Sequence, residues 1–131
     1  MAEEKETKDV KLGGSISLVG FGILDQSEII VAKKIVGNYV KMMNNEGSYK
    51  EMKLTLKRHQ KGNQWLHEVM GEAIFREGKF AATAGHKGTH TNAWDPYSVI
   101  SEVCEKILAE LKHRVKKEQR HDKNLGSEKI E

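Results

Sequence analysis

The clearest helix pattern in the sequence is Asp95-Pro-Tyr-Ser-Val-Ile-Ser-Glu-Val-Cys-Glu-Lys-Ile-Leu-Ala-Glu-Leu-Lys-His-Arg114. The Asp95 carboxylate can cap the first turn of a helix, and Pro96 suits the first helical position. The apolar residues that follow recur at three-and-four spacing, one stripe of a helix: Ile100, Val103, Cys104, Ile107, Leu108, Leu111 and Val115. The opposite side carries a basic ridge. On this helix alone, such a ridge is more typical of a solvated face than of a binding surface.

Length and composition indicate one soluble domain. The 131 residues suffice to bury a core, and the formal charge is +3. Six Lys or Arg stand against two acids between Lys112 and Lys123, so the positive charge gathers near the end of the chain. The single cysteine, Cys104, lies on the apolar stripe, which predicts a buried, inert thiol and a reducing compartment. No secretory signal or membrane-spanning run is present. A cytoplasmic protein is expected.

The first half of the chain predicts a strand and a helix. Residues 1–14 are charged and read as a disordered leader. Ser15–Gly20 alternates polar and apolar residues, as a strand does. Asp25 and Glu28 form a capping-box pair that opens a helix, and Asn44-Asn-Glu-Gly47 ends it. The predicted buried stripe of this helix is Ala32, Ile35, Val36, Tyr39, Val40 and Met43.

The outer face of this first helix is basic and contains a glycine. Lys34 and Lys41 lie two turns apart, with Gly37 between them and Lys33 on the flank. Glycine inside a helix costs roughly 1 kcal/mol relative to alanine. Gly37 is therefore either a place where a sugar–phosphate backbone approaches closely or a tolerated defect, and the sequence does not choose between them.

The middle of the chain predicts three more strands. Tyr49–Arg58 alternates, with Met52, Leu54 and Leu56 on the inner face. His67–Arg76 and Lys79–Ala84 read as a hairpin with Phe75, Phe80, Ala82 and Ala84 inward. A polar loop, Gly85–Trp94, leads to the Asp95 cap. After Arg114 the pattern fades through a frayed end to a polar, basic tail at 118–131.

The predicted fold class is α+β, in a single domain over 15–117 with the order β-α-β-β-β-α. A helix between the first two strands implies a parallel crossover, whereas the short later connections imply antiparallel neighbours. Each helix has one apolar stripe. We therefore expect a four-stranded mixed sheet with both helices packed on one face.

The sequence offers no catalytic constellation. There is no nucleophile elbow, P-loop or dinucleotide glycine pattern, and Cys104 has no evident activating partner. The candidate metal ligands are His59, His67, His86 and His90. His86 and His90 are four residues apart, but they lie among glycines and not on a helix that would align them. We expect no enzyme, no metal, no cofactor and no small-molecule substrate. A histidine-ligated, metal-dependent enzyme remains the competing hypothesis from that class.

The two basic ridges favour RNA as a partner. If the helices lie side by side, the ridges Lys34/Gly37/Lys41 and Lys106/Ala109/His113/Lys117 would flank one groove. Lys and Arg bind phosphates without reading sequence. Neither ridge carries aromatic side chains, which argues against a single-strand binder that works by stacking. Structured RNA, recognised by shape and backbone, fits this pattern better.

Five residues fall at the spacings found in the second helix of a known family: Asp95, Tyr97, Ile100, Lys106 and Leu111. The segment resembles that helix in the ribosome hibernation-promoting factors, also called ribosome-associated translation inhibitors. Lys79-Phe-Ala-Ala-Thr-Ala84 is similar to the strand that precedes it in the family, and Leu18-Val-Gly20 to the family's first strand. The likeness extends over about residues 15–117, in a short and divergent form that is compatible with an archaeal member.

The resemblance implies a function on the ribosome. Members occupy the decoding region of the small ribosomal subunit, inhibit translation and protect idle ribosomes without catalysis. Contacts to ribosomal RNA come from basic residues on the two helices. Lys106 matches a basic position of the family, Lys112, His113 and Arg114 fall in its basic run, and Lys33, Lys34 and Lys41 correspond by helix and face. With Lys116 and Lys117 from the second ridge, these are the predicted RNA-binding residues.

The chain departs from the family pattern in three places. Ala109 stands where a basic residue is common. The 85–94 loop is long, so His86, Lys87, His90 and Asn92 are candidate additional RNA contacts. No dimerisation domain is evident. The competing binding hypothesis is a general double-stranded-RNA module without a ribosomal address.

Overall fold

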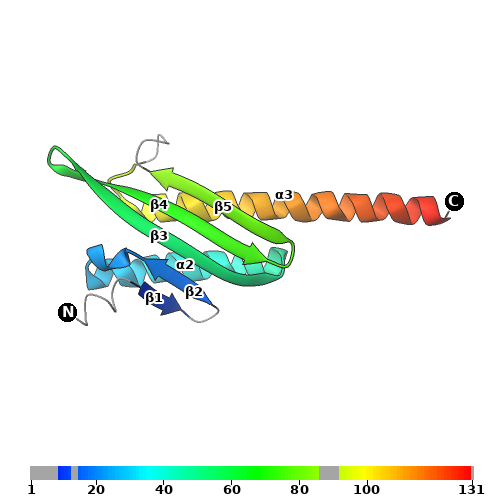
Figure 1. The fold of residues 1–131 in the computed structure, drawn as a ribbon, viewed down its shortest axis with the longest axis horizontal. Helices are drawn as coiled ribbons and strands as arrows, with labels where there is room; N and C mark the ends of the chain where they lie inside the picture. Colours follow the sequence, from blue (N-terminus) through cyan, green and yellow to red (C-terminus); the bar gives the residue numbers. More distant parts are fainter. Residues whose placement is uncertain (1–8, 13–14, 86–91, 131) are drawn as a thin grey trace.

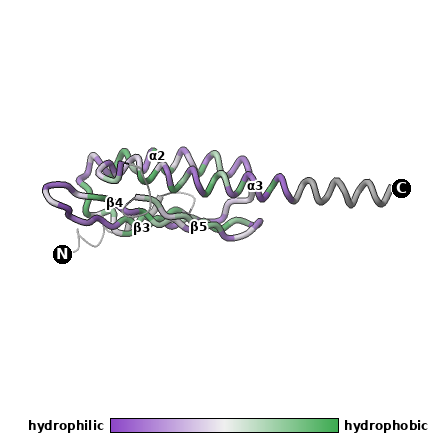
Figure 2. Tube along the Cα trace, turned by 90° about the horizontal axis from the view of Figure 1, so that it is seen from above, coloured by the Kyte–Doolittle hydropathy of each residue, from purple (hydrophilic) through white to green (hydrophobic). Residues whose placement is uncertain are grey.

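The computed structural model describes residues 9–12, 15–85 and 92–130. Two long helices, α2 (Gln26–Glu46) and α3 (Pro96–Ile130), run side by side on one face of a mixed sheet, as Figures 1 and 2 show. The strands, in spatial as well as chain order, are β1 (Asp9–Leu12), β2 (Ile16–Val19), β3 (Tyr49–Lys61), β4 (Gln64–Phe75) and β5 (Gly78–Gly85). A short 3₁₀ helix, η1 (Phe21–Ile23), joins β2 to α2. The predicted α+β class and the placement of both helices are confirmed.

The sheet is mixed because α2 carries the chain back across it. β2 and β3 pair in parallel, with Ile16 opposite Met52 and Leu18 opposite Leu54. The β3–β4 and β4–β5 pairs are antiparallel. Two residues, Gly62 and Asn63, separate β3 from β4, and Gly62 has a φ of 62°. A glycine in that conformation is typical of a tight hairpin turn.

The prediction of a disordered leader over 1–14 is wrong for Asp9–Leu12. These residues form β1, which pairs antiparallel with β2 and adds a fifth strand at the edge of the four predicted. Val10 and Leu12 alternate with charged residues, and Gly13-Gly14 is a pair typical of hairpin turns. The high charge of the segment concealed this short pattern.

The predicted end of the last helix is also wrong. The backbone of α3 stays helical to Ile130, across the residues expected to be a tail, and extends well beyond the sheet (Figure 1). Without an apolar stripe the segment has no core to pack on. It is, however, rich in Lys, Arg, Glu and Gln and lacks proline, and these residues favour continuation of a helix once it has started.

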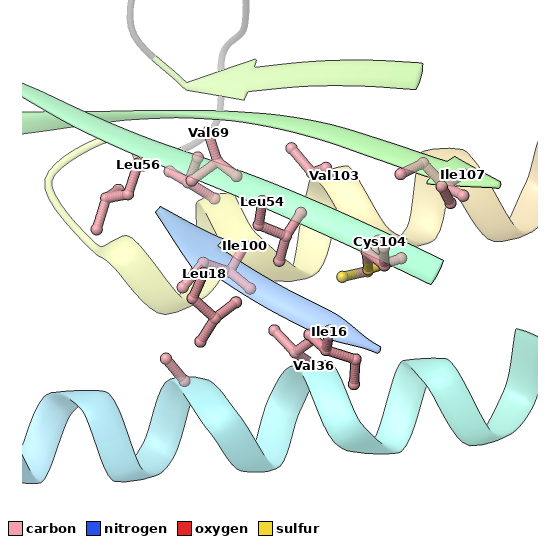
Figure 3. Close-up of a cluster of buried hydrophobic side chains, with 14 of the residues drawn as sticks. Ile16, Leu18, Val36, Leu54, Leu56, Val69, Ile100, Val103, Cys104 and Ile107 are labelled. Atoms are coloured by element: carbon pink, nitrogen blue, oxygen red, sulfur yellow. The ribbon is translucent and has the colours of Figure 1, made fainter. Parts of the chain in front are cut away.

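The core lies between the helices and the sheet (Figure 3). The predicted inner residues of the strands are buried, including Leu18, Leu54 and Phe80, and Ala82 is partly buried. On α3 the stripe from Ile100 to Leu111 is buried as predicted, Cys104 included. On α2, Ala32, Val36 and Met43 are buried, whereas Ile35, Tyr39 and Val40 are partly so. Apolar faces of both helices and the sheet therefore close on one another.

Candidate nucleic-acid interface

The start of α3 is fixed by Asp95. Its Oδ1 accepts a hydrogen bond from the Tyr97 amide at 3.0 Å, and its Oδ2 accepts one from the Ser98 hydroxyl at 2.9 Å. The cap and the buried stripe together set the rotation of the helix about its axis. This rotation decides where the basic residues of α3 point.

Five predicted RNA-binding residues gather on one part of α3. All five side chains are exposed, and only the half-buried Val115 lies between them in the sequence: Lys112, His113, Arg114, Lys116 and Lys117. We call this set the α3 basic surface. It lies where α3 passes the β4–β5 turn and leaves the sheet (Figure 1).

A shallow depression lies beside the α3 basic surface. It has a volume of about 430 Å³ and is lined by Phe80, Ala109, Glu110, His113, Arg114 and Lys117. The Phe80 side chain is buried, and Ala109 is too short to fill the space above it. Ala109 therefore leaves a recess that is surrounded by cationic and imidazole groups and also by the Glu110 carboxylate.

Arg114 also has a structural role. Its Nη1 donates a hydrogen bond to the Glu77 carbonyl oxygen at 3.2 Å, and its guanidinium carbon lies 5.2 Å from the Phe80 ring centroid. Glu77 in turn accepts a hydrogen bond from the Ser48 amide, and this bond holds the pKa of the Glu77 carboxyl below its ordinary value. Arg114 therefore joins α3 to the β4–β5 turn.

Lys106 points toward β5. Its Nζ donates to the Thr83 carbonyl oxygen at 2.9 Å and lies 3.1 Å from the Glu102 carboxylate. This lysine is therefore occupied by its own chain, on the side of α3 that faces the sheet edge.

The crevice between the helices carries a carboxylate. The Tyr39 hydroxyl of α2 donates to Glu105 Oε2 of α3 at 2.9 Å. Burial and this neighbouring carboxylate raise the pKa of Tyr39 to about 12, so the hydroxyl keeps its proton and the bond persists at neutral pH. The expected single groove with cations on both walls does not form, because Lys106 faces away from α2 and Glu105 lies between the helices.

The predicted lysines of α2 form a separate surface. Lys34 and Lys41 are exposed, and Lys33 is partly buried. Between them, a Cβ added to Gly37 would have no heavy atom within 4 Å. No hydrogen bond or ion pair engages Lys34 or Lys41 within 15–85 and 92–117. They are available to an external partner.

The predicted loop contacts are only partly described. His86, Lys87 and His90 lie outside the described residues. Asn92 is exposed, and its carbonyl oxygen accepts a hydrogen bond from the Asp95 amide at 2.9 Å. Asn92 thus supports the turn that leads into α3.

The two described candidate metal ligands are separated. His67 pairs in register with Arg58, so His59, one residue later on β3, lies on the other face of the sheet. His59 Nε2 is 3.6 Å from Glu68 Oε1 there, and His67 is buried with Nδ1 2.9 Å from the Ala93 carbonyl oxygen. Among the residues that the structure describes, no group of three or more His, Cys, Asp or Glu is placed to hold a metal.

A second concave site lies at the opposite end of the sheet, and sequence reasoning did not single it out. The β3–β4 hairpin extends there beyond the helices (Figure 1). A depression of about 350 Å³ is lined there by Arg58, Trp65 and Trp94, together with residues from the start of both helices. β3 was predicted to end at Arg58 and β4 to begin at His67, whereas both strands continue to the Gly62-Asn63 turn. A prediction of β4 that included Trp65 would have indicated this second site.

Comparison with known proteins finds no family model that matches the chain and no relative among the curated proteins. Within the described part of the chain, no helix is both long enough and apolar enough to cross a membrane.

Proposed function

We propose that this protein is a non-enzymatic, cytoplasmic factor that binds the ribosomal RNA of the small subunit at its decoding region and inhibits translation. The observation that carries the proposal is the α3 basic surface. Its five cationic or titratable side chains are exposed on a helix whose position is set by a buried stripe on the other side. Several exposed cations on one stretch of helix can neutralise several phosphates, and binding releases counterions.

The fold supports the same proposal. The element order from β2 to α3 is the β-α-β-β-β-α order that the resemblance implies, with β1 as an addition at the edge. The residues that carry the resemblance have clear structural roles, since Asp95 caps α3 and Ile100 and Leu111 are buried. The likeness to the hibernation factors therefore includes both core and cap positions.

The direction of the basic residues modifies the expected mode of binding. Lys106 lies against β5 and Arg114 against the β4–β5 turn, whereas Lys34 and Lys41 are exposed on α2, with the Tyr39–Glu105 bond between the helices. Two separate RNA contacts replace the single groove. Lys106 and Arg114 hold α3 to β5 and to the β4–β5 turn, and they contribute less to RNA binding than Lys112, Lys116 and Lys117.

The first prediction concerns the α3 basic surface. Replacing Lys112, Lys116 and Lys117 with glutamine should weaken co-sedimentation with small ribosomal subunits by about tenfold or more at physiological salt. The dependence of log affinity on log salt should become shallower by about one for each phosphate that a lysine no longer neutralises. Translation in a reconstituted system should be inhibited correspondingly less.

The matched control replaces Lys50, Lys53 and Lys57 of β3 with glutamine. These lysines are also exposed, and the change in net charge is the same. Ribosome binding should change little. Equal losses in both variants would contradict a binding surface on α3, and no co-sedimentation of the wild-type protein at low salt would contradict ribosome binding itself. If free duplex RNA competes as well as ribosomes do, the general double-stranded-RNA hypothesis replaces this one.

A further inference from the structure

The depression beneath the β3–β4 hairpin contains the two tryptophans of the chain. Trp65 is 43% exposed and Trp94 is 57% exposed. Large aromatic side chains left in water next to a concavity mark a binding site more often than chance placement does. Neither residue belongs to the α3 basic surface, which lies at the other end of β4 and β5.

Local structure holds these aromatic groups in place. The alternation of β4 puts Trp65 on the same face as His67, which pairs in register with Arg58 on β3. The Arg58 guanidinium carbon lies 4.3 Å from the Trp65 ring centroid and restricts its orientation. The segment before Trp94 is fixed because the Ala93 carbonyl oxygen accepts a hydrogen bond from the His67 amide at 2.6 Å.

The charges around the depression exclude some ligands. Arg58 already places a cation over the Trp65 ring, which disfavours a second cation such as an ammonium group in this aromatic site. The same guanidinium attracts a phosphate. On the helix side stands Glu28, whose Oε1 accepts the Asp25 amide at 2.9 Å, so that Oε2 remains as an acceptor. Anionic groups of a ligand are directed to the hairpin side, and donor groups to the helix side.

The remaining polar group suits the edge of a base. Gln64 lines the depression and carries both a donor and an acceptor on its amide. A nucleotide has an aromatic face, a hydrogen-bonding edge and a phosphate. The tryptophans, the Gln64 and Glu28 side chains, and Arg58 match these three features. An apolar peptide side chain would use the rings alone and leave the polar groups without a role.

We propose that this depression binds one unpaired nucleotide of an RNA strand, with its base stacked on tryptophan and its phosphate beside Arg58. The proposal rests on the proposed function in taking RNA as the partner, and it adds a second contact of different chemistry. The α3 basic surface holds backbone phosphates, whereas this site accepts only a base that is free to leave its helix. The protein would thus favour RNA in which an unpaired residue lies near a structured region.

The second prediction tests this site with intrinsic fluorescence. The chain has only two tryptophans, and both line the depression, so their emission reports on it directly. A short unstructured RNA oligonucleotide should quench the emission in a saturable way, and a blunt duplex of the same sequence should not. Trp65→Ala and Trp94→Ala, each read through the remaining tryptophan, should weaken binding by about tenfold, as expected for loss of one stacking surface.

Further variants separate stacking from charge and from folding. Trp65→Phe keeps an aromatic face and should lose less affinity than Trp65→Ala. Arg58→Gln should weaken binding and make it less dependent on salt. Met70→Ala removes another exposed apolar side chain of β4, on the opposite face, and should leave quenching unchanged.

The outcomes distinguish this site from the proposed function. No quenching by the single strand, or an affinity that is unchanged in both Trp65→Ala and Trp94→Ala, overturns the nucleotide site even if the protein sediments with ribosomes. Saturable quenching without ribosome binding would retain the site and overturn the ribosomal function. Equal quenching by the duplex would show that no unpaired base is required, and it would also overturn the site.

Discussion

At the scale of single residues, Gly71 shows how closely α3 approaches the sheet. A Cβ built at Gly71 would lie 2.6 Å from Val103 Cγ1 of α3 and 2.8 Å from Leu54 Cδ2 of β3. Val103 is β-branched, so it has few alternative side-chain conformations in a helix. The glycine therefore allows α3 to pack closely against β3 and β4.

The third prediction compares two glycine-to-alanine substitutions. Gly71→Ala should lower the free energy of unfolding by about 1–3 kcal/mol, because the added methyl group overpacks the helix–sheet contact. Gly37→Ala should raise it by about 0.5–1 kcal/mol, since Gly37 lies inside α2 with open space around it. Urea denaturation measures both. Equal effects of the two substitutions would contradict the packing seen at Gly71.

Gly37→Ala also decides between the two readings of that glycine. If RNA backbone approaches α2 there, the more stable variant should bind ribosomes less tightly. Unchanged binding would identify Gly37 as a tolerated defect of the helix.

At the scale of elements, α2 begins with a complete capping box. Asp25 Oδ1 accepts the Glu28 amide at 2.8 Å, and Glu28 Oε1 accepts the Asp25 amide at 2.9 Å. The Ser27 hydroxyl also donates to Asp25 Oδ1. The bond from the Glu28 amide and that from Ser27 hold the pKa of Asp25 below its ordinary value of 3.8. The sequence pair Asp25 and Glu28 was sufficient to predict this local structure.

The fourth prediction is a pH dependence of this cap. Because the pKa of Asp25 is lowered by folding, its carboxylate stabilises the protein above the ordinary pKa and loses that contribution as the pH falls through the lowered value. The stability difference between wild type and Asp25→Asn should therefore shrink on acidification. Urea denaturation across a pH series measures it. The free energies of unfolding of Asp25→Asn and Asp25→Ala should differ by the same amount at every pH, since neither side chain titrates. A difference between wild type and Asp25→Asn that does not change with pH would contradict the role of the charge.

At the scale of the whole molecule, Cys104 lies where the helices and the sheet meet. It is fully buried, and burial, with the Glu105 charge, raises the pKa of the thiol to about 12. Such a thiol stays protonated and does not react as a nucleophile at neutral pH. The expectation of a buried cysteine is confirmed, and its lack of reactivity stays a prediction.

The fifth prediction uses this thiol to follow opening of the fold. Alkylation of Cys104 should require α3 to leave both α2 and the sheet, so its rate should follow the population of globally unfolded protein as urea is added. The reading is unambiguous because the chain has a single cysteine. Rapid labelling in the absence of urea would instead show that α3 detaches by itself while the sheet remains folded.

Features that depend on local spacing could be predicted from the amino-acid sequence alone. The three-and-four stripe of α3, the alternation of Met52, Leu54 and Leu56, and the caps at Asp25 and Asp95 each lie within a few residues of chain. The edge strand β1 and the continuation of α3 were missed, since charge masked a four-residue pattern and an unpacked helix has no apolar stripe. Elements, core and layer order were therefore largely predictable.

Which functional residues lie close together depends on how distant elements pack, and the sequence did not predict it. Lys106 was expected to be a free cation, but Thr83 and Glu102 lie beside it, and the expected groove contains the Tyr39–Glu105 bond. The pairing of β3 with β4 and the loop before α3 bring together Arg58, Trp65 and Trp94. These residues are too far apart in the sequence for a local pattern to predict their contact. Periodicity records which side of an element is buried. It does not record what the other side faces, because that depends on the packing of elements far apart in the chain.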